Sequence, residues 1–111
     1  TVGFMKKKGH AFPFSWQRRW FIFDHATRVL QYGETEVSAQ RHPLGTLTVE
    51  SARCAGGLLV DVNATSREKG RYTLHLDVPS AARAQVWLGA FHRWTVGLNR
   101  VLKNHNRKVC I

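Results

Sequence analysis

Apolar and polar residues alternate with a period of two along the first three quarters of the chain, the pattern of β-strands with one buried face. The alternation is strictest in Arg71–Val78, where Tyr72, Leu74, Leu76 and Val78 share one face. Similar short segments recur between turn residues, as in small β-sandwiches and barrels. We predict about seven strands, with Ser51–Cys54 either separate or continuing the strand before it: Gly3–Lys8, Trp16–Phe23, Arg28–Tyr32, Gly45–Val49, Ser51–Cys54, Leu58–Val62 and Arg71–Val78.

Turn and loop signals separate these strands. His10–Ser15 contains Pro13 and is predicted to be a loop, and Asp24–Thr27 is predicted to turn the chain. Gly33–Pro43 is a longer polar loop, and Ala64–Gly70 is a charged turn. The first three strands could therefore form a meander joined by hairpin loops.

The hydrophobic period changes after Pro79. Ser80 is a suitable N-cap for a helix that we expect from about Ala81 to about Lys103. Its apolar stripe has helical spacing and consists of Trp87, Phe91, Trp94, Leu98, Val101 and Leu102. A helix with such a stripe can cover the open end of a small barrel. The predicted fold class is thus mainly β with one C-terminal α-helix, a seven-stranded bent barrel or sandwich capped by that helix.

Four parts of the chain resemble signature segments of one family. Gly3–Gly9 (GFMKKKG) is similar to its first strand, and Trp16–Phe23 (WQRRWFIF) to the W-K-x-R-W/Y-F-x-L pattern of its second. Trp87 stands in the closing helix, where the family keeps a Trp, and His42–Leu47 (HPLGTL) is similar to the start of its fourth strand. On these segments the chain resembles a pleckstrin-homology (PH) domain. We expect residues 1–111 to be one such domain, a fragment of a larger protein.

The net charge of +10 lies at the two ends of the chain. Residues 1–23 and 78–111 carry basic residues and no acidic ones, whereas residues 24–77 are nearly balanced. A domain with this charge is attracted to polyanions, whether lipid headgroups, nucleic acids or acidic proteins. Charge alone does not choose among them, but no recognition-helix or Arg/Gly-rich motif supports specific nucleic-acid binding.

The sequence carries no motif typical of an enzyme or a metal protein. We find no Ser/His/Asp grouping, no Gly-rich phosphate loop and no metal-ligand spacing among the six His and two Cys. Cys54 and Cys110 form no CxxC pair; a disulfide is possible but unneeded at this size, and we favour reduced thiols of a cytosolic protein. We therefore expect neither catalysis nor a cofactor or metal.

The resemblance to PH domains implies a site below the loop at residues 8–15. There Lys7, Arg19 and Tyr32 would converge, at positions that hold inositol phosphates in phosphoinositide-binding members. Gln17 and Leu44 depart from the basic residues of high-affinity members, which favours looser recognition of anionic lipid, such as a phosphoinositide or phosphatidic acid. The predicted headgroup-binding residues are Lys6, Lys7, Lys8, His10, Gln17, Arg18, Arg19, Tyr32, Arg67, Lys69 and Arg71.

Two further segments are candidates for membrane contact. Phe12 and Phe14 flank Pro13 beside basic residues, so we predict that they insert at the headgroup boundary. The basic residues that follow Trp94 could form a second contact: Arg100, Lys103, Arg107 and Lys108, with Arg93 just before it.

These observations favour a membrane-targeting module that binds anionic phospholipids, works as a monomer in the cytoplasm and associates peripherally with the membrane. The alternative is a protein-interaction PH domain with little lipid specificity, whose helix or sheet edge contacts a partner. Loss of vesicle binding after charge reversal at Lys7 and Arg19 would favour the first, and sensitivity to changes on the helix face would favour the second.

Overall fold

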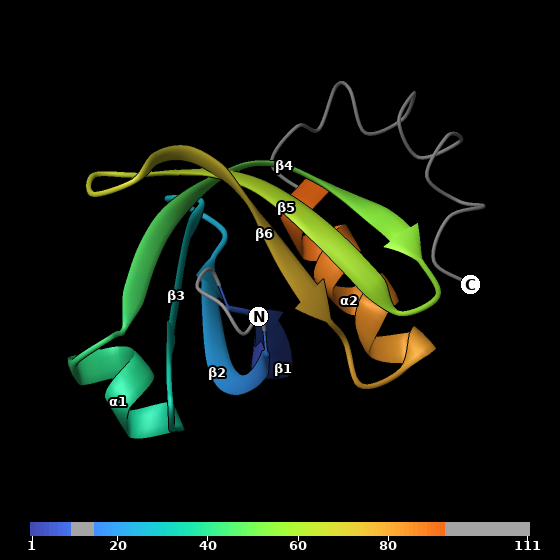
Figure 1. The fold of residues 1–111 in the computed structure, drawn as a ribbon, viewed down its shortest axis with the longest axis horizontal. Coiled ribbons are helices and arrows are strands. Elements are labelled where there is room, and N and C mark those ends of the chain that lie inside the picture. The colour runs from blue at the N-terminus through green and yellow to red at the C-terminus, as the bar shows by residue number, and fades with distance from the viewer. Residues whose placement is uncertain (10–14, 93–111) are drawn as a thin grey trace.

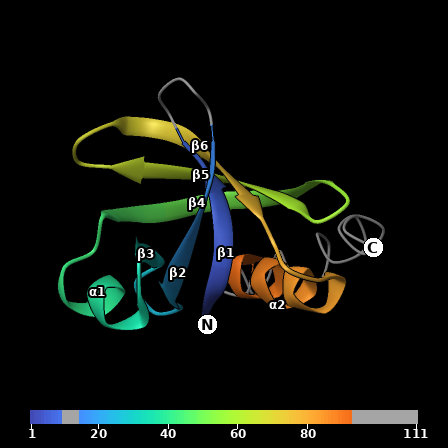
Figure 2. The ribbon, with the colours of Figure 1, turned by 60° about the horizontal axis from the view of Figure 1, so that its bottom comes forward.

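Six antiparallel strands close into a barrel in this protein (Figures 1 and 2). The structure is a computed structural model, and it describes residues 1–9 and 15–92. The elements are β1 (Val2–Lys8), β2 (Trp16–Asp24), β3 (Val29–Gly33), α1 (Glu36–Arg41), β4 (Gly45–Gly56), β5 (Leu59–Ser66), β6 (Gly70–Asp77) and α2 (Ala81–His92).

The strands follow one another around the barrel in sequence order, and β6 returns to β1. β1 and β2 pair along the whole of β1, from Val2 opposite Ile22 to Lys8 opposite Trp16. The closing pair is much shorter: only Lys6 and Lys7 of β1 stand opposite residues of β6. β1 therefore separates from β6 over most of its length.

The core contains the inward-facing residue of each alternating pair. On β2 the side chains of Phe21 and Phe23 are buried, whereas the intervening Ile22 is only partly so. On β6 the buried Leu74 and Leu76 alternate with the exposed Thr73 and His75. The period-two pattern thus correctly predicted which faces enter the barrel.

Helix α2 lies against one end of the barrel (Figure 2) and packs against β4. Ser80 accepts a hydrogen bond at its Oγ from the N–H of Arg83, 3.2 Å away, which confirms it as the N-cap. Trp87 and Phe91 are buried, and the Phe91 ring meets Phe23 edge-on at 5.0 Å between centroids. The predicted cap is confirmed through His92; its continuation, with Trp94 and Leu98, lies outside the described residues.

The segment predicted as a polar loop at Gly33–Pro43 contains a short helix, so that prediction was wrong. Thr35 caps α1, and its side chain and that of Ser38 hydrogen-bond reciprocally to each other's backbone N–H. The helix packs against β2 and β3. A Cβ at Gly33 would lie 2.6 Å from the backbone nitrogen of Ala39, so only glycine permits this close approach.

The prediction of seven strands also needs correction, because the described residues contain six. Gly45–Val49 and Ser51–Cys54 belong to one long strand, β4. Its pairing with β5 shifts register between Val49 and Ser51. Such a bulge bends a strand without ending it, and this lets β4 run from one side of the barrel to the other.

Candidate functional site

Three side chains predicted to converge do so at the open end of the barrel. Lys7 of β1 points inward and is only 5% exposed. Its Nζ lies 5.3 Å from the centroid of the Tyr32 ring, close enough for a cation–π contact. Burial lowers the pKa of Lys7, and the charges of Lys69 and Arg19 lower it further. Cations from three separate elements therefore act on the same small region.

Two tyrosines, Tyr32 and Tyr72, line this region. Burial raises the pKa of Tyr32, and the nearby Arg19 and Glu68 act on it in opposite directions. Burial and the neighbouring Tyr32 raise the pKa of Tyr72. Sequence reasoning assigned Tyr72 only to the core face of its strand; its place at the end of that strand, next to the charged turn, was the available signal.

Gly45 leaves the space that the Tyr32 ring occupies. A Cβ built on Gly45 would lie 2.5 Å from ring and hydroxyl atoms of Tyr32. Gly45 and Tyr32 are also direct partners across β3 and β4. At position 45, any residue other than glycine would therefore displace the Tyr32 ring.

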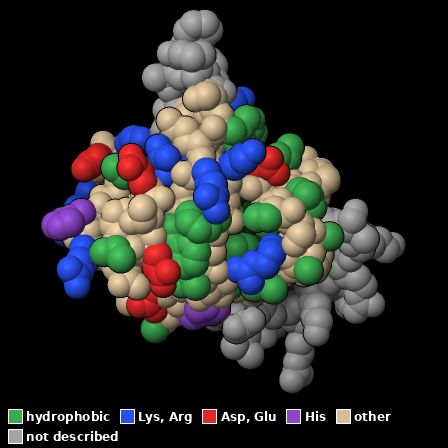
Figure 3. Space-filling model, turned by 90° about the horizontal axis from the view of Figure 1, so that it is seen from below, with side chains coloured by type: hydrophobic (Ala, Val, Ile, Leu, Met, Phe, Trp, Pro, Cys, Tyr) green, Lys and Arg blue, Asp and Glu red, His purple; other side chains and the backbone are tan. Residues whose placement is uncertain are grey.

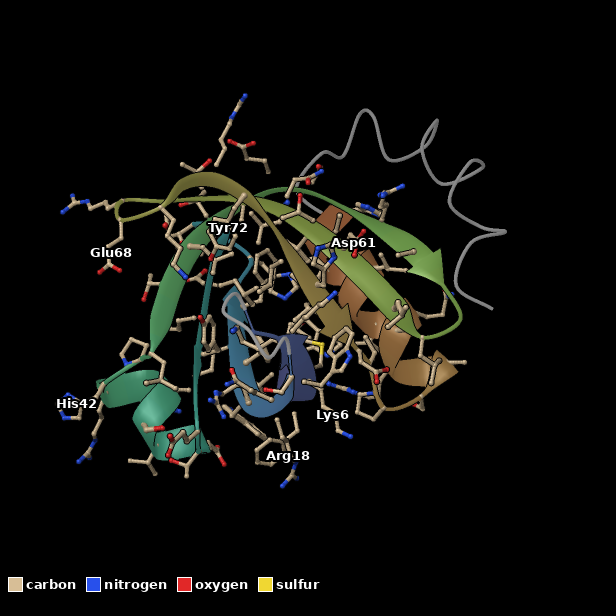
Figure 4. The ribbon with its side chains drawn as sticks, in the orientation of Figure 1. Lys6, Arg18, His42, Asp61, Glu68 and Tyr72 are labelled. Atoms are coloured by element: carbon tan, nitrogen blue, oxygen red, sulfur yellow. The ribbon has the colours of Figure 1, made fainter. Side chains whose placement is uncertain are left out.

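A groove of about 400 Å³ opens beside the tyrosines. It runs between the start of β4 and the turn that joins β5 to β6. Figure 4 shows Tyr72 and Glu68 on this side of the barrel. The residues that line it are Tyr32, Pro43, Leu44, Gly45, Thr46, Leu47, Thr48, Thr65, Ser66, Arg67, Glu68, Lys69 and Tyr72.

The β5–β6 turn brings two bases and one acid to the groove. The backbone N–H of Lys69 donates to Ser66 Oγ at 2.9 Å, and its Nζ lies 5.6 Å from the centroid of Tyr72. Arg67 and Glu68 are exposed beside it. We call the set Lys7, Arg19, Tyr32, Arg67, Lys69 and Tyr72 the inner rim.

Gln17 also lies next to the inner rim, because it is the cross-strand partner of Lys7 and shares a face with Arg19. The guanidinium of Arg19 donates from Nη1 to the carbonyl oxygen of Arg18 at 2.9 Å, which fixes one of its nitrogens. Gln17 can donate a hydrogen bond but adds no charge.

Other predicted binding residues lie elsewhere. Lys6, Lys8 and Arg18 are exposed on the outer face of β1 and β2. Each is adjacent along its strand to an inner-rim residue, Lys7 or Arg19, and therefore points to the opposite side. Arg71 forms an ion pair with Glu50, with 3.5 Å between Nε and Oε1, and does not line the groove. His10, Phe12, Phe14 and the basic residues after His92 lie outside the described residues.

Several simpler expectations can also be compared with the structure. Within residues 1–9 and 15–92, no three His, Cys, Asp or Glu side chains are grouped so that they could hold a metal ion. None of the described helices has the length and apolarity needed to cross a membrane. The state of the two cysteines stays a prediction, because Cys110 lies outside the described residues.

Comparisons with known proteins identify the fold. No family model matches the sequence, and no curated protein matches it. Solved structures do match. The PH domain of human oxysterol-binding protein-related protein 11 is 24% identical, with a TM-score of 0.66, over 82% of this chain and 75% of that one. The PH domain of human TBC1 domain family member 2 is 20% identical, with a TM-score of 0.66, over 85% and 80%.

A third similar structure was determined with a ligand. The C-terminal PH domain of pleckstrin, in complex with D-myo-Ins(1,2,3,4,5)P5, is 18% identical, with a TM-score of 0.67, over 84% of this chain and 94% of that one. All three likenesses cover more than four fifths of this chain. The chain has the fold of a pleckstrin-homology domain.

Proposed function

We propose that this domain binds the anionic headgroups of membrane phospholipids through the inner rim and thereby targets its protein to a membrane. The observation that carries the proposal is the environment of Lys7. The residue is almost fully buried, and the charges of Lys69 and Arg19 act on its ammonium group. Among the described residues, no carboxylate forms an ion pair with it. A phosphate group would supply the missing negative charge.

The chemistry of the rim suits phosphate. Lys7 offers a point charge beside Tyr32, which lines the groove, and the Arg19 guanidinium offers planar N–H donors that match phosphate oxygens. Arg67 and Lys69 extend the positive potential along the turn. Each basic residue close to an anionic membrane contributes about 1 kcal/mol, so these four support salt-sensitive binding.

The same rim argues against strict recognition of a polyphosphorylated ring. Gln17 and Leu44 stand where more bases would be needed, and Glu68 adds a negative charge beside the groove. We therefore propose loose recognition of phosphatidic acid, phosphatidylserine or phosphoinositides with few phosphates. The pentakisphosphate-bound pleckstrin domain supports an inositol phosphate as one chemistry that this fold accommodates.

The proposal includes the loop between β1 and β2. Its aromatic residues Phe12 and Phe14 would enter the headgroup boundary next to the rim and hold the domain at the surface of the membrane. In the Phe12→Ala/Phe14→Ala variant, we expect weaker sedimentation with vesicles. Undiminished sedimentation would remove this part of the proposal and leave the rim untouched. A cytoplasmic location with peripheral membrane association follows from the same proposal.

A lipid panel tests the function. Vesicles of phosphatidylcholine are mixed with one anionic lipid at a time at matched surface charge, and binding is measured at two salt concentrations. We expect binding to every anionic vesicle, with a preference for headgroups with a terminal phosphate, and weakening at the higher salt. Equal binding to pure phosphatidylcholine, or none to any vesicle, would refute the proposal.

A further inference from the structure

The outer face of β1 and β2 carries a second cationic cluster that the inner rim does not use. Lys6 and Arg18 are direct partners across the two strands, and Phe4 and Trp20 form the next outward-facing pair. The guanidinium carbon of Arg18 lies 3.7 Å from the centroid of the Phe4 ring. Phe4 meets Trp20 edge-on at 4.7 Å between centroids. The exposed Arg18 guanidinium thus lies over the ring of Phe4, which in turn packs against Trp20.

A groove of about 460 Å³ lies next to this cluster. It forms where β1 separates from β6, because their pairing is confined to Lys6 and Lys7. β6 ends at Asp77, and Pro79, which lacks a backbone N–H, turns the chain toward α2. The groove is lined by Phe4, Met5, Lys6, Arg18, Leu58, Asp77, Val78 and Pro79. Its walls are mostly apolar, and its two cations come from adjacent strands.

The charges on this face are unbalanced. Lys6 stands between Arg18 on β2 and Asp77 on β6, so one carboxylate faces two cations. Like charges directly opposite each other destabilise a sheet, so this pair is a local cost. Among the described residues, no ion pair involves Lys6 or Arg18. An incoming carboxylate would relieve the repulsion.

We propose that this outer groove docks an acidic segment of a partner protein. A carboxylate of that segment binds between Lys6 and Arg18, and a neighbouring apolar side chain packs against Phe4, Val78 and Pro79. Arg and aromatic residues are the types enriched where binding energy concentrates in protein interfaces. The concave apolar wall suits a side chain better than the flat surface of a bilayer.

The outer groove and the inner rim face different directions. Figure 4 shows the side chains of Lys6 and Arg18 pointing away from Tyr72 and Glu68. Seen from below in Figure 3, Lys and Arg side chains border apolar ones near the middle of this face. A membrane bound at the inner rim would therefore leave the outer groove open, and the two ligands could be held together.

An NMR titration of the whole chain tests the proposal. The probe is a synthetic heptapeptide with three Glu, one Leu and one Phe, and its control has Gln in place of each Glu. With the acidic peptide we expect amide shifts centred on Phe4, Lys6, Arg18 and Val78. The Gln peptide should bind at least tenfold more weakly, because it cannot supply the charge. Equal binding of the two peptides, or shifts centred on Tyr32 and Tyr72, would overturn the proposal.

Variants separate the outer groove from the inner rim. The Lys6→Gln/Arg18→Gln variant should lose at least tenfold in affinity for the acidic peptide and keep its binding to phosphatidic acid vesicles. Arg41→Gln, an exposed charge on α1 outside both sites, should change neither. An unchanged amide spectrum away from the substitutions establishes that each variant is folded. Retained peptide affinity in the double variant, or loss of vesicle binding instead, would refute a peptide site.

Discussion

The inner rim and the outer groove each take two cations from β1 and β2, and these cations are one residue apart along each strand. Lys7 and Arg19 point into the barrel end, and Lys6 and Arg18 point away from it. Lys7 is 5% exposed and its pKa is lowered by burial, whereas Lys6 is exposed. A run of basic residues on one strand therefore contributes to two surfaces, because successive side chains face opposite sides of the sheet. Lys7 on one surface is buried and Lys6 on the other is exposed.

The two surfaces differ in how far their charged groups are buried and in which groups they contact. At the inner rim, Lys7 has lost water and gained an aromatic ring and other cations, so the site is poised for an anion at a defined place. On the outer face, Arg18 rests on Phe4 but stays accessible to solvent. Desolvated charges gain more from a partner than exposed ones, which predicts a stronger dependence of binding on the inner pair.

The largest effect is expected from a substitution that disturbs the inner rim without changing a charge. In Gly45→Ala, the new Cβ collides with the Tyr32 ring, which is buried under Lys7. Overpacking of this kind costs about 1–3 kcal/mol. We expect urea denaturation to show a loss in that range and vesicle affinity to fall. The peptide affinity of the outer groove should persist.

Gly89→Ala is the matched control for that change. Gly89 lies in α2, and a Cβ there would meet nothing within 4 Å. Alanine is the better helix former by about 1 kcal/mol, so this variant should be equally or more stable. A Gly45→Ala protein as stable as the wild type would show that Tyr32 is not fixed as described.

Removing the inner charges should have the next largest effect. Lys7→Met keeps an apolar side chain in the buried position, and Arg19→Gln keeps a donor. At about 1 kcal/mol for each base, the double variant should bind phosphatidic acid vesicles roughly 30-fold more weakly. Because Met replaces a buried cation, the free energy of unfolding of the variant should not fall below that of the wild type. A vesicle affinity within threefold of the wild type would contradict the proposed rim.

The lowered pKa of Lys7 gives a pH dependence that the outer bases do not share. The folded-state pKa lies below the usual 10.5, because burial and the cations nearby disfavour the charged form. At lower pH Lys7 is protonated in both the folded and the unfolded state, and the folded state carries the full free-energy cost of burying the charge. As pH rises through the folded-state pKa toward 10.5, the unfolded chain binds more protons, so stability rises.

Comparison of the wild type with Lys7→Met isolates this contribution, since Tyr32, Tyr72 and Arg28 titrate in both proteins. Urea unfolding from pH 7.5 to 10 should show the wild type gaining on the variant as pH rises. Binding to phosphatidylglycerol vesicles, whose charge is constant in this range, should weaken over the same interval only in the wild type. Parallel pH profiles in the two proteins would show that Lys7 titrates as it does in water.

The sequence predicted the barrel and its inward faces, because strand alternation is a local property that tertiary structure preserved. The convergence of Lys7, Arg19 and Tyr32 was implied by the resemblance to PH domains. Sequence reasoning missed α1, since six residues are too few to show a helical period, although Thr35 and Ser38 carried a capping signal. It also left open whether Ser51–Cys54 continues the preceding strand, because a bulge near Glu50 looks like a break when only one strand is visible.

The sequence could not sort the bases of the β5–β6 turn, because their partners come from distant elements. Arg71 pairs with Glu50 on β4, and Lys69 lies over Tyr72 and acts on Lys7. Both positions look alike in the segment Arg67–Arg71. Only the fold shows that one side chain lines the groove and the other does not.

This difference gives the smallest and sharpest test, because two bases two residues apart are compared. Lys69→Gln removes a charge from the inner rim, and we expect about a fivefold loss of affinity for phosphatidic acid vesicles, equivalent to about 1 kcal/mol. Arg71→Gln removes the same charge from an exposed ion pair, which is worth little, so its effect should stay below twofold. Equal losses would mean that the membrane senses net charge alone. Unequal losses in the predicted direction would mean that the placement of each charge decides binding.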